Sequence, residues 1–126
     1  CLVAMDDLDT GSRFFWGEVG EPESDPVAAL SRHYMDRPAC PRQADWAHQV
    51  EQLATWAKEF RIDGVVELPL VQSPARGFRA PYLRKAMEER RIPFTSEVRE
   101  YSFSSAGQLG NRIEPFVEML RERKGG

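Results

Sequence analysis

Cysteine and histidine are scarce in this chain, with two of each among 126 residues. The two cysteines, Cys1 and Cys40, are too few to build a disulfide framework or to hold an iron–sulfur cluster without further ligands. The separation of Cys40 from His33 and His48 matches no compact metal-ligand spacing. The residues alone therefore predict neither a disulfide-rich fold nor a self-contained metal site, and no metal ligand is assigned.

An excess of positive charge and a long apolar run are also missing. Lys and Arg number 17 and Asp and Glu 20, for a net charge of −3, which disfavours a nucleic-acid partner. No stretch resembles a signal peptide or a membrane span, so we expect a cytoplasmic protein with no membrane partner. A Gly-rich phosphate loop is missing too, which argues against the alternative of a flavodoxin-like domain that binds flavin or nucleotide.

The chain begins with Cys1, and the strand-like residues Leu2 and Val3 follow directly. We expect from this that the sequence is part of a longer protein. Two alternatives remain. A mature lipoprotein begins with cysteine, although a polar tether usually follows it, and an N-terminal nucleophile hydrolase would use the terminal amine as its base.

Apolar runs and helical periodicity alternate along the chain. Strands are predicted at residues 2–5, 65–68 and 94–98, and helices at 26–34, 44–61, about 80–90 and 105–120. This alternation predicts an α/β fold with a small parallel sheet and helices on both faces. We expect one domain over residues 1–126, a three-layer sandwich that is flavodoxin-like in outline.

Local signals predict where helices begin and which faces point inward. Asp25 with Pro26 is typical of a helix start, and Ser105 with Gln108 has the capping-box spacing. Pro115 inside the last helix predicts a kink or a restart. The faces expected to point inward are Val27, Leu30 and Tyr34; Trp46, Val50, Leu53, Ala57 and Phe60; Leu83, Ala86 and Met87; and Leu109, Ile113, Phe116, Val117 and Leu120.

Polar residues near the expected carboxyl ends of the strands are the candidates for a site. Asp7, between two further aspartates, and Arg13 follow the first strand, where carboxylates can bind a hard cation or simply cap a loop and pair with Arg13. Gln108 and Arg112 share one face near the start of the last helix, where an anion is stabilised, although an ordinary cap explains them equally well.

Ser73 follows the second predicted strand and directly precedes Pro74. As a nucleophile it would need a base, and both histidines fall on predicted helices. No Gly-x-Ser-x-Gly elbow surrounds it, so a catalytic triad is not expected and no catalytic residue is assigned.

Several segments together resemble one family, the 2-hydroxyacyl-CoA dehydratase and benzoyl-CoA reductase subunits. Residues 6–15, Asp-Asp-Leu-Asp-Thr-Gly-Ser-Arg-Phe-Phe, resemble the family segment Asp-Asp-Leu-x-Thr-Gly-x-Arg-Tyr. Residues 107–120 resemble its signature Gly-Gln-x-x-x-Arg-x-Glu-Ala-Phe-x-Glu-Met-Leu. Residues 25–34, Cys40-Pro41 and residues 63–66 are similar to the helix, the Cys-Pro and the strand that the family places between them.

The resemblance implies the C-terminal domain of one subunit of a two-subunit enzyme that acts on CoA thioesters. Family members hold a [4Fe-4S] cluster, with one cysteine from this domain, and an ATP-hydrolysing activator protein supplies a low-potential electron. It implies as partners a homologous second subunit, the activator and an acyl-CoA substrate. We predict that Asp7, Arg13, Gln108 and Arg112 bind the substrate, and that Ser73 is the cofactor-binding position.

Two residues depart from the family pattern. Ser73 stands where the family has its cluster cysteine, and a serine oxygen is a harder and poorer ligand for iron than a thiolate. Pro115 replaces a small helix-forming residue. The alternative is therefore a cluster-less scaffold or interaction subunit of the same family.

Overall fold

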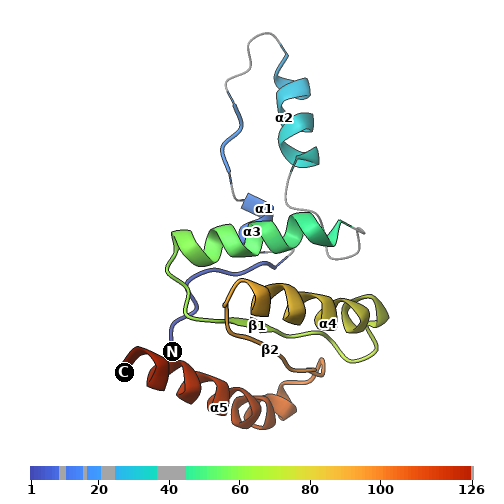
Figure 1. Ribbon diagram of the computed structural model, residues 1–126. Helices are drawn as coiled ribbons and strands as arrows, with labels where there is room; N and C mark the ends of the chain where they lie inside the picture. Colours follow the sequence, from blue (N-terminus) through green and yellow to red (C-terminus); the bar gives the residue numbers. More distant parts are fainter. Residues whose placement is uncertain (9–10, 16, 21–24, 37–44, 126) are drawn as a thin grey trace.

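The computed structural model describes residues 1–8, 11–15, 17–20, 25–36 and 45–125 (Figure 1). Helices make up most of these ranges, and a short pair of strands lies in the second half of the chain. In chain order the elements are α1 (Ser12–Phe15), α2 (Pro26–Met35), α3 (Trp46–Glu59), β1 (Val65–Glu67), α4 (Pro74–Glu89), β2 (Phe94–Ser96), the 3₁₀ turn η1 (Phe103–Ser105) and α5 (Ala106–Gly125).

The strands β1 and β2 are parallel and α4 connects them, which confirms the predicted parallel α/β unit. An isolated parallel bridge between Leu70 and Arg99 extends the pairing beyond the ends of both strands. The paired residues are Val65 with Phe94, Val66 with Thr95 and Glu67 with Ser96.

Residues 2–5, predicted as a further strand, form no regular structure, and that prediction is wrong. Leu2 is 87% exposed and Val3 is 78% exposed. A strand gains stability when a neighbour completes its hydrogen-bond ladder and covers its apolar side chains, and these side chains are uncovered. In the described ranges the sheet has two strands. The three-layer, flavodoxin-like arrangement stays a prediction.

The core lies between α3, α4 and β2. Val50, Leu83, Met87 and Phe94 are each at least nine-tenths buried and pack in one cluster with Ala86. These contacts confirm the predicted inward faces of α3 and α4. In Figure 1, α3 and α4 lie on one side of the strand pair and α5 lies on the other.

Two helices end at an arginine with a left-handed backbone. Arg61 follows α3 with φ 51°, and Arg91 follows α4 with φ 60°. After α3, the N–H of Ile62 reaches back to the carbonyl of Ala57 (2.8 Å). After α4, Ile92 does the same toward Met87 (2.9 Å). This is the Schellman arrangement, which usually has glycine at the left-handed position. α3 therefore ends at Glu59, slightly before the predicted limit near Arg61.

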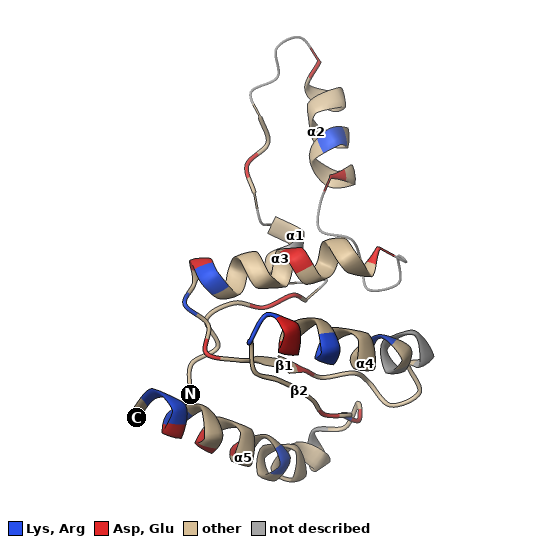
Figure 2. Ribbon diagram, viewed as in Figure 1, with Lys and Arg blue, Asp and Glu red and all other residues tan. Residues whose placement is uncertain are grey.

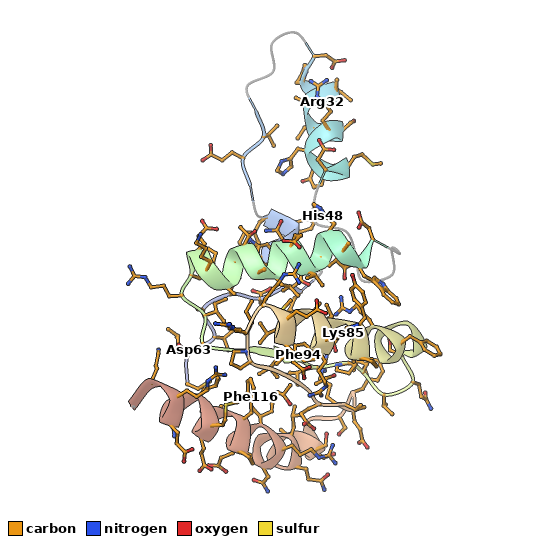
Figure 3. The ribbon with its side chains drawn as sticks, viewed as in Figure 1. Arg32, His48, Asp63, Lys85, Phe94 and Phe116 are labelled. Atoms are coloured by element: carbon orange, nitrogen blue, oxygen red, sulfur yellow. The ribbon has the colours of Figure 1, made fainter. Side chains whose placement is uncertain are left out.

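The last helix packs against the start of β1 through Gly64. A Cβ at Gly64 would lie 2.8 Å from Cζ of Phe116 and 2.9 Å from Cδ1 of Leu120, so only glycine allows this approach without movement. Figure 3 shows Phe116 on the side of α5 that faces the strands. The apolar face predicted for this helix is partly buried, as expected. Pro115 is exposed and α5 continues through it, so the predicted restart is wrong.

The helix α2 is present where Asp25 and Pro26 predicted it. The Asp25 carboxylate accepts from the N–H groups of Val27 (2.9 Å) and Ala28 (3.2 Å). Its predicted inward face is wrong, because Val27, Leu30 and Tyr34 are 69%, 45% and 53% exposed. In Figure 1 this helix extends away from α3 and the strands, which leaves that face uncovered.

Candidate functional site

Ser73 lies at the carboxyl end of β1, at the N-cap position of α4. Its backbone N–H donates to the carbonyl of Leu70 (3.1 Å), and its side chain is partly buried. The hydroxyl does not cap the first turn of α4, which begins with Pro74 instead. Gln72 next to it has φ 64°, a left-handed conformation that is unusual for a residue with a side chain. The turn is thus a tight and strained one.

This turn is also hydrogen-bonded to Arg99, in the segment that follows β2. The N–H of Val71 donates to the carbonyl of Arg99 (2.8 Å), and the N–H of Arg99 donates to the carbonyl of Pro69 (2.9 Å). Pro69 is buried. The backbone that leads to Ser73 is therefore held at Pro69 and Val71 by hydrogen bonds to Arg99.

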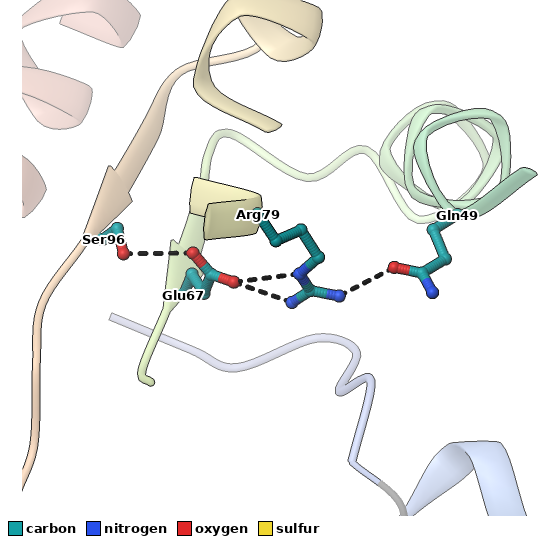
Figure 4. A network of polar contacts seen from close by, with 4 residues as sticks. All are labelled: Gln49, Glu67, Arg79 and Ser96. Atoms are coloured by element: carbon teal, nitrogen blue, oxygen red, sulfur yellow. Dashed lines mark hydrogen bonds and ion pairs between the residues drawn. The ribbon is translucent and has the colours of Figure 1, made fainter. Parts of the chain in front are cut away.

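A buried polar network lies beside the turn, formed by Gln49, Glu67, Arg79 and Ser96 (Figure 4). Oε1 of Glu67 accepts from Arg79 through Nε (3.2 Å) and Nη2 (2.7 Å). The Nη1 group of Arg79 donates to Oε1 of Gln49 (2.8 Å), and the Ser96 hydroxyl donates to the other Glu67 oxygen (3.0 Å). Gln49, Glu67 and Arg79 are 3%, 7% and 5% exposed. The network thus joins α3, β1, α4 and β2.

Removing two charges from water is costly, and this network offsets the cost by pairing them and bonding both carboxylate oxygens. Gln49, Glu67 and Arg79 were not among the predicted site residues, although the sequence carries signals of their burial. Glu67 ends a strand in which Val65 and Glu67 point to one side while Val66 is 38% exposed on the other. Arg79 precedes Leu83 by four residues and so shares the buried face of α4. A charged residue on an otherwise apolar face, with an opposite charge on the apolar face of the next element, indicates a buried ion pair.

The acidic loop near the N-terminus is organised by Asp6. Its carboxylate accepts from the N–H of Leu8 (3.1 Å), from the N–H of Ser12 (3.0 Å) and from the Ser12 hydroxyl (3.0 Å). The hydrogen bond from the Ser12 backbone is the main cause that lowers the pKa of Asp6 below its usual value. A Cβ at Gly11 would lie 2.1 Å from Oδ1 of Asp6, so glycine is needed there.

The predicted site residues of this loop are only partly described. Asp7 is partly buried in the loop. Arg13 lies within α1, and its side chain is outside the described part of the structure. The observed partners of the Asp6 carboxylate are Leu8 and Ser12, so a hydrogen-bonded loop is what the described residues show. Within those residues no group of three or more His, Cys, Asp or Glu side chains could hold a metal ion.

Gln108 and Arg112 lie on the first turns of α5 and are both exposed. The predicted capping box is replaced by a local contact, in which the Ser105 hydroxyl donates to the carbonyl of Ser102 (3.0 Å). Figure 1 places α5 below the strands and α1 near α3 above them. The structure therefore does not bring Gln108 and Arg112 together with the loop of Asp7.

Both signs of charge occur on the helices of the described part of the chain. Figure 2 shows acidic and basic residues along both α4 and α5. An open groove of about 340 Å³ between α3 and α4 is crossed by an ion pair between Arg90 and Glu51. No helix in the described ranges is both long enough and apolar enough to cross a membrane.

The donor atoms near Ser73 can be compared with what a [4Fe-4S] cluster requires, which is thiolate sulfur. Ser73 offers a hydroxyl, and Cys1 has an exposed free thiol. Cys40 with its Cys-Pro segment lies outside the described residues. Within the described residues, the donors therefore do not fit a [4Fe-4S] cluster, because Ser73 offers oxygen and Cys1 is a single thiol.

Comparison with known proteins gives two similarities. Residues 1–120 match the family "2-hydroxyglutaryl-CoA dehydratase, D-component". Over 73 residues the chain is 27% identical to the Escherichia coli (strain K12) protein named "Putative dehydratase subunit YjiM". That match covers 57% of this chain and 19% of YjiM, so the chain spans only a small part of that relative's length.

Proposed function

Because the chain belongs to the 2-hydroxyglutaryl-CoA dehydratase D-component family, we propose that it is a domain of a dehydratase subunit that acts on a 2-hydroxyacyl-CoA thioester. The family match over residues 1–120 is the observation that carries this proposal. The parallel strand pair, with Ser73 at its carboxyl end, supports it, because α/β sheets place ligands at that end.

In this proposal the enzyme is cytoplasmic and has two homologous subunits, together with an activator protein that hydrolyses ATP. A [4Fe-4S] cluster in the whole enzyme would supply the low-potential electron for dehydration of the 2-hydroxyacyl-CoA. In the reductases of the resembling family, the corresponding substrate is an aromatic acyl-CoA, whose ring is reduced. In this proposal the chain contributes the residues at the carboxyl ends of the parallel strands. The Ser73 hydroxyl lies in the turn after β1. Asp7 and Arg13 on the N-terminal loop, and separately Gln108 and Arg112 on α5, are proposed to contact different parts of the substrate.

The second candidate function is a cluster-less scaffold or interaction subunit of the same family. Ser73 favours it, because a hydroxyl replaces the thiolate that the family resemblance places there. A subunit of this kind would keep the fold and the contacts with its partner, and its partner would perform the electron transfer.

Anaerobic purification of the full-length subunit with its neighbouring subunit tests the two candidates. Iron and acid-labile sulfide are measured in the native protein, in Ser73→Cys and in the exposed control Ser104→Cys. The enzyme proposal predicts about four iron atoms per subunit, unchanged in Ser104→Cys, and turnover of a 2-hydroxyacyl-CoA with activator and ATP. Folded native protein that binds its partner without iron or turnover would contradict it and support the scaffold.

The Ser73→Cys variant adds a separate readout. If Ser73 occupies the ligand position, a thiolate there should make the bound cluster more resistant to chelators, whereas Ser104→Cys should have no effect. An equal rate of iron loss in all three proteins would show that Ser73 is not at the cluster.

A further inference from the structure

Glu67 and Arg79 are twelve positions apart and bracket the segment that carries Ser73. Glu67 is the last residue of β1, and Arg79 lies in the second turn of α4. Between them the chain reverses through Gln72, whose φ of 64° is unfavourable for a side-chain-bearing residue. A strained backbone persists only where its surroundings fix it.

The same two residues are also fixed from outside the segment. Gln49 on α3 accepts from Arg79, and Ser96 at the end of β2 donates to Glu67. Pro69 and Val71, at the start of the turn, are hydrogen-bonded to Arg99, which follows β2. The buried polar network and the bridge at Arg99 therefore hold the two sides of the turn.

From this geometry we infer that Glu67 and Arg79 are positioning residues, which hold Ser73 at the carboxyl edge of the sheet. The functional meaning of that position rests on the proposed function, but the geometry of the turn does not. Arg79 places two donors of one planar group on a single carboxylate oxygen, which fixes direction as well as distance.

A merely structural role would give a different result from a positioning role. Apolar residues of similar volume often replace a buried ion pair without loss of stability. If the network only fills the core, such a replacement should not change how often the turn opens. If the network holds the turn in place, the replacement should keep the fold but let the turn open more often, so that position 73 is exposed to solvent more of the time.

The experiment uses the full-length protein with its second subunit, carrying Ser73→Cys and freed of iron with a chelator. The rate at which iodoacetamide labels the new thiol is read by mass spectrometry on the tryptic peptide of residues 62–76, so other cysteines do not interfere. The test variant adds Gln49→Leu, Glu67→Leu and Arg79→Met to this parent. The control adds Leu120→Ala, which removes a partly buried side chain at the opposite end of β1.

We expect the apolar triple variant to be labelled at least about tenfold faster than the parent, because local opening of the turn exposes the thiol. The control should be labelled at the parent rate when both are compared at equal global stability. An unchanged rate in a folded triple variant would overturn the inference. If the triple variant does not fold, Arg79→Lys takes its place, since it keeps the charge and loses the planar fork, and the same rates decide.

Iron content and turnover are measured separately in the native protein, which keeps Ser73. Native protein without iron or turnover, together with a labelling rate that responds to the triple variant, would refute the enzyme proposal and leave the positioning role intact. Native protein with iron and turnover, together with a labelling rate that does not respond, would refute the positioning role and leave the enzyme proposal intact.

Discussion

Two carboxylates anchor two turns of this molecule in opposite environments. Asp6 is partly exposed and bonds to Leu8 and Ser12, only two and six residues along the chain. Glu67 is 7% exposed, and its partners Arg79 and Ser96 come from α4 and β2, up to 29 positions away. The contacts of Asp6 close a loop without help from other elements. The contacts of Glu67 and Arg79 form only when α3, β1, α4 and β2 are packed together, and they in turn stabilise that packing.

The difference shows how burial changes the energetic role of similar groups. Near solvent, a lost hydrogen bond is replaced by one to water, so each contact contributes modestly to stability. In the interior no water replaces it, and a charge left without its partner is strongly destabilising. The most damaging substitutions should therefore fall in the buried network, although the acidic loop looks richer in charge.

The largest expected effect is that of Arg79→Met. It leaves the buried Glu67 carboxylate without its cation, and we expect a loss of about 3–5 kcal/mol in the free energy of unfolding. Urea unfolding followed by circular dichroism measures it. A loss below about 1 kcal/mol would mean that water reaches Glu67 and that the contrast between the two regions does not hold.

Gly11→Ala should have the next largest effect. Its Cβ would lie 2.1 Å from Oδ1 of Asp6, so the carboxylate must leave Ser12, at a cost of about 1–2 kcal/mol. The matched control is Gly110→Ala on α5, where nothing lies within 4 Å of the new Cβ. That control should be neutral or slightly stabilising because alanine is the better helix former. Equal effects would contradict the loop geometry.

The pH dependence of stability should distinguish Asp6 from exposed carboxylates. Its pKa is lowered in the folded state, mainly by the Ser12 backbone N–H, so its stabilisation is fully present above the unfolded pKa of about 3.9. It is lost as the pH falls through the folded pKa. We expect the stability difference between native protein and Asp6→Asn to shrink below about pH 4.

The control for this measurement is Glu122→Gln, on the exposed side of α5. Its difference from the native protein should change little over the same range. A constant difference for Asp6→Asn would show that the carboxylate is not anchored by Ser12 in solution.

Lys124→Met should have the smallest effect. Nζ of Lys124 lies 2.6 Å from Oδ2 of Asp63, but the two side chains are 69% and 45% exposed. Exposed pairs contribute little, so a change within about 0.5 kcal/mol is expected from the same urea unfolding measurement. A loss as large as that of Arg79→Met would show that burial does not explain the different stability contributions of the exposed and buried ion pairs.

Much of the fold could be predicted because its signals are local. The cap at Asp25 and the apolar faces of α3 and α4 each depend on residues a few positions apart. The strand pair joins residues 29 positions apart, but the local strand–helix–strand order predicted that it would be parallel. The failed predictions concern coverage by distant segments. Leu2 and Leu30 are apolar in the sequence, but whether another element covers them is not a local property.

The candidate site also contains residues that the sequence predicted and residues that only the structure identified. Ser73 was identified from its place after a predicted strand and from the family resemblance, and the structure places it at the carboxyl end of β1. The roles proposed for Asp7, Arg13, Gln108 and Arg112 remain predictions. Glu67 and Arg79 were missed because each looked like an ordinary surface charge until its burial and its partner were known.

The sequence by itself determined the family of this protein, the order of its main helices and parallel strands, and the serine in the turn after β1. Periodicity, caps and motifs are properties of neighbouring residues, so the sequence displays them directly. Only the tertiary structure decided which charges are buried together and which apolar faces are covered. Those outcomes depend on the packing of elements that are far apart in the chain, and burial decides whether a charge is solvated or must be paired.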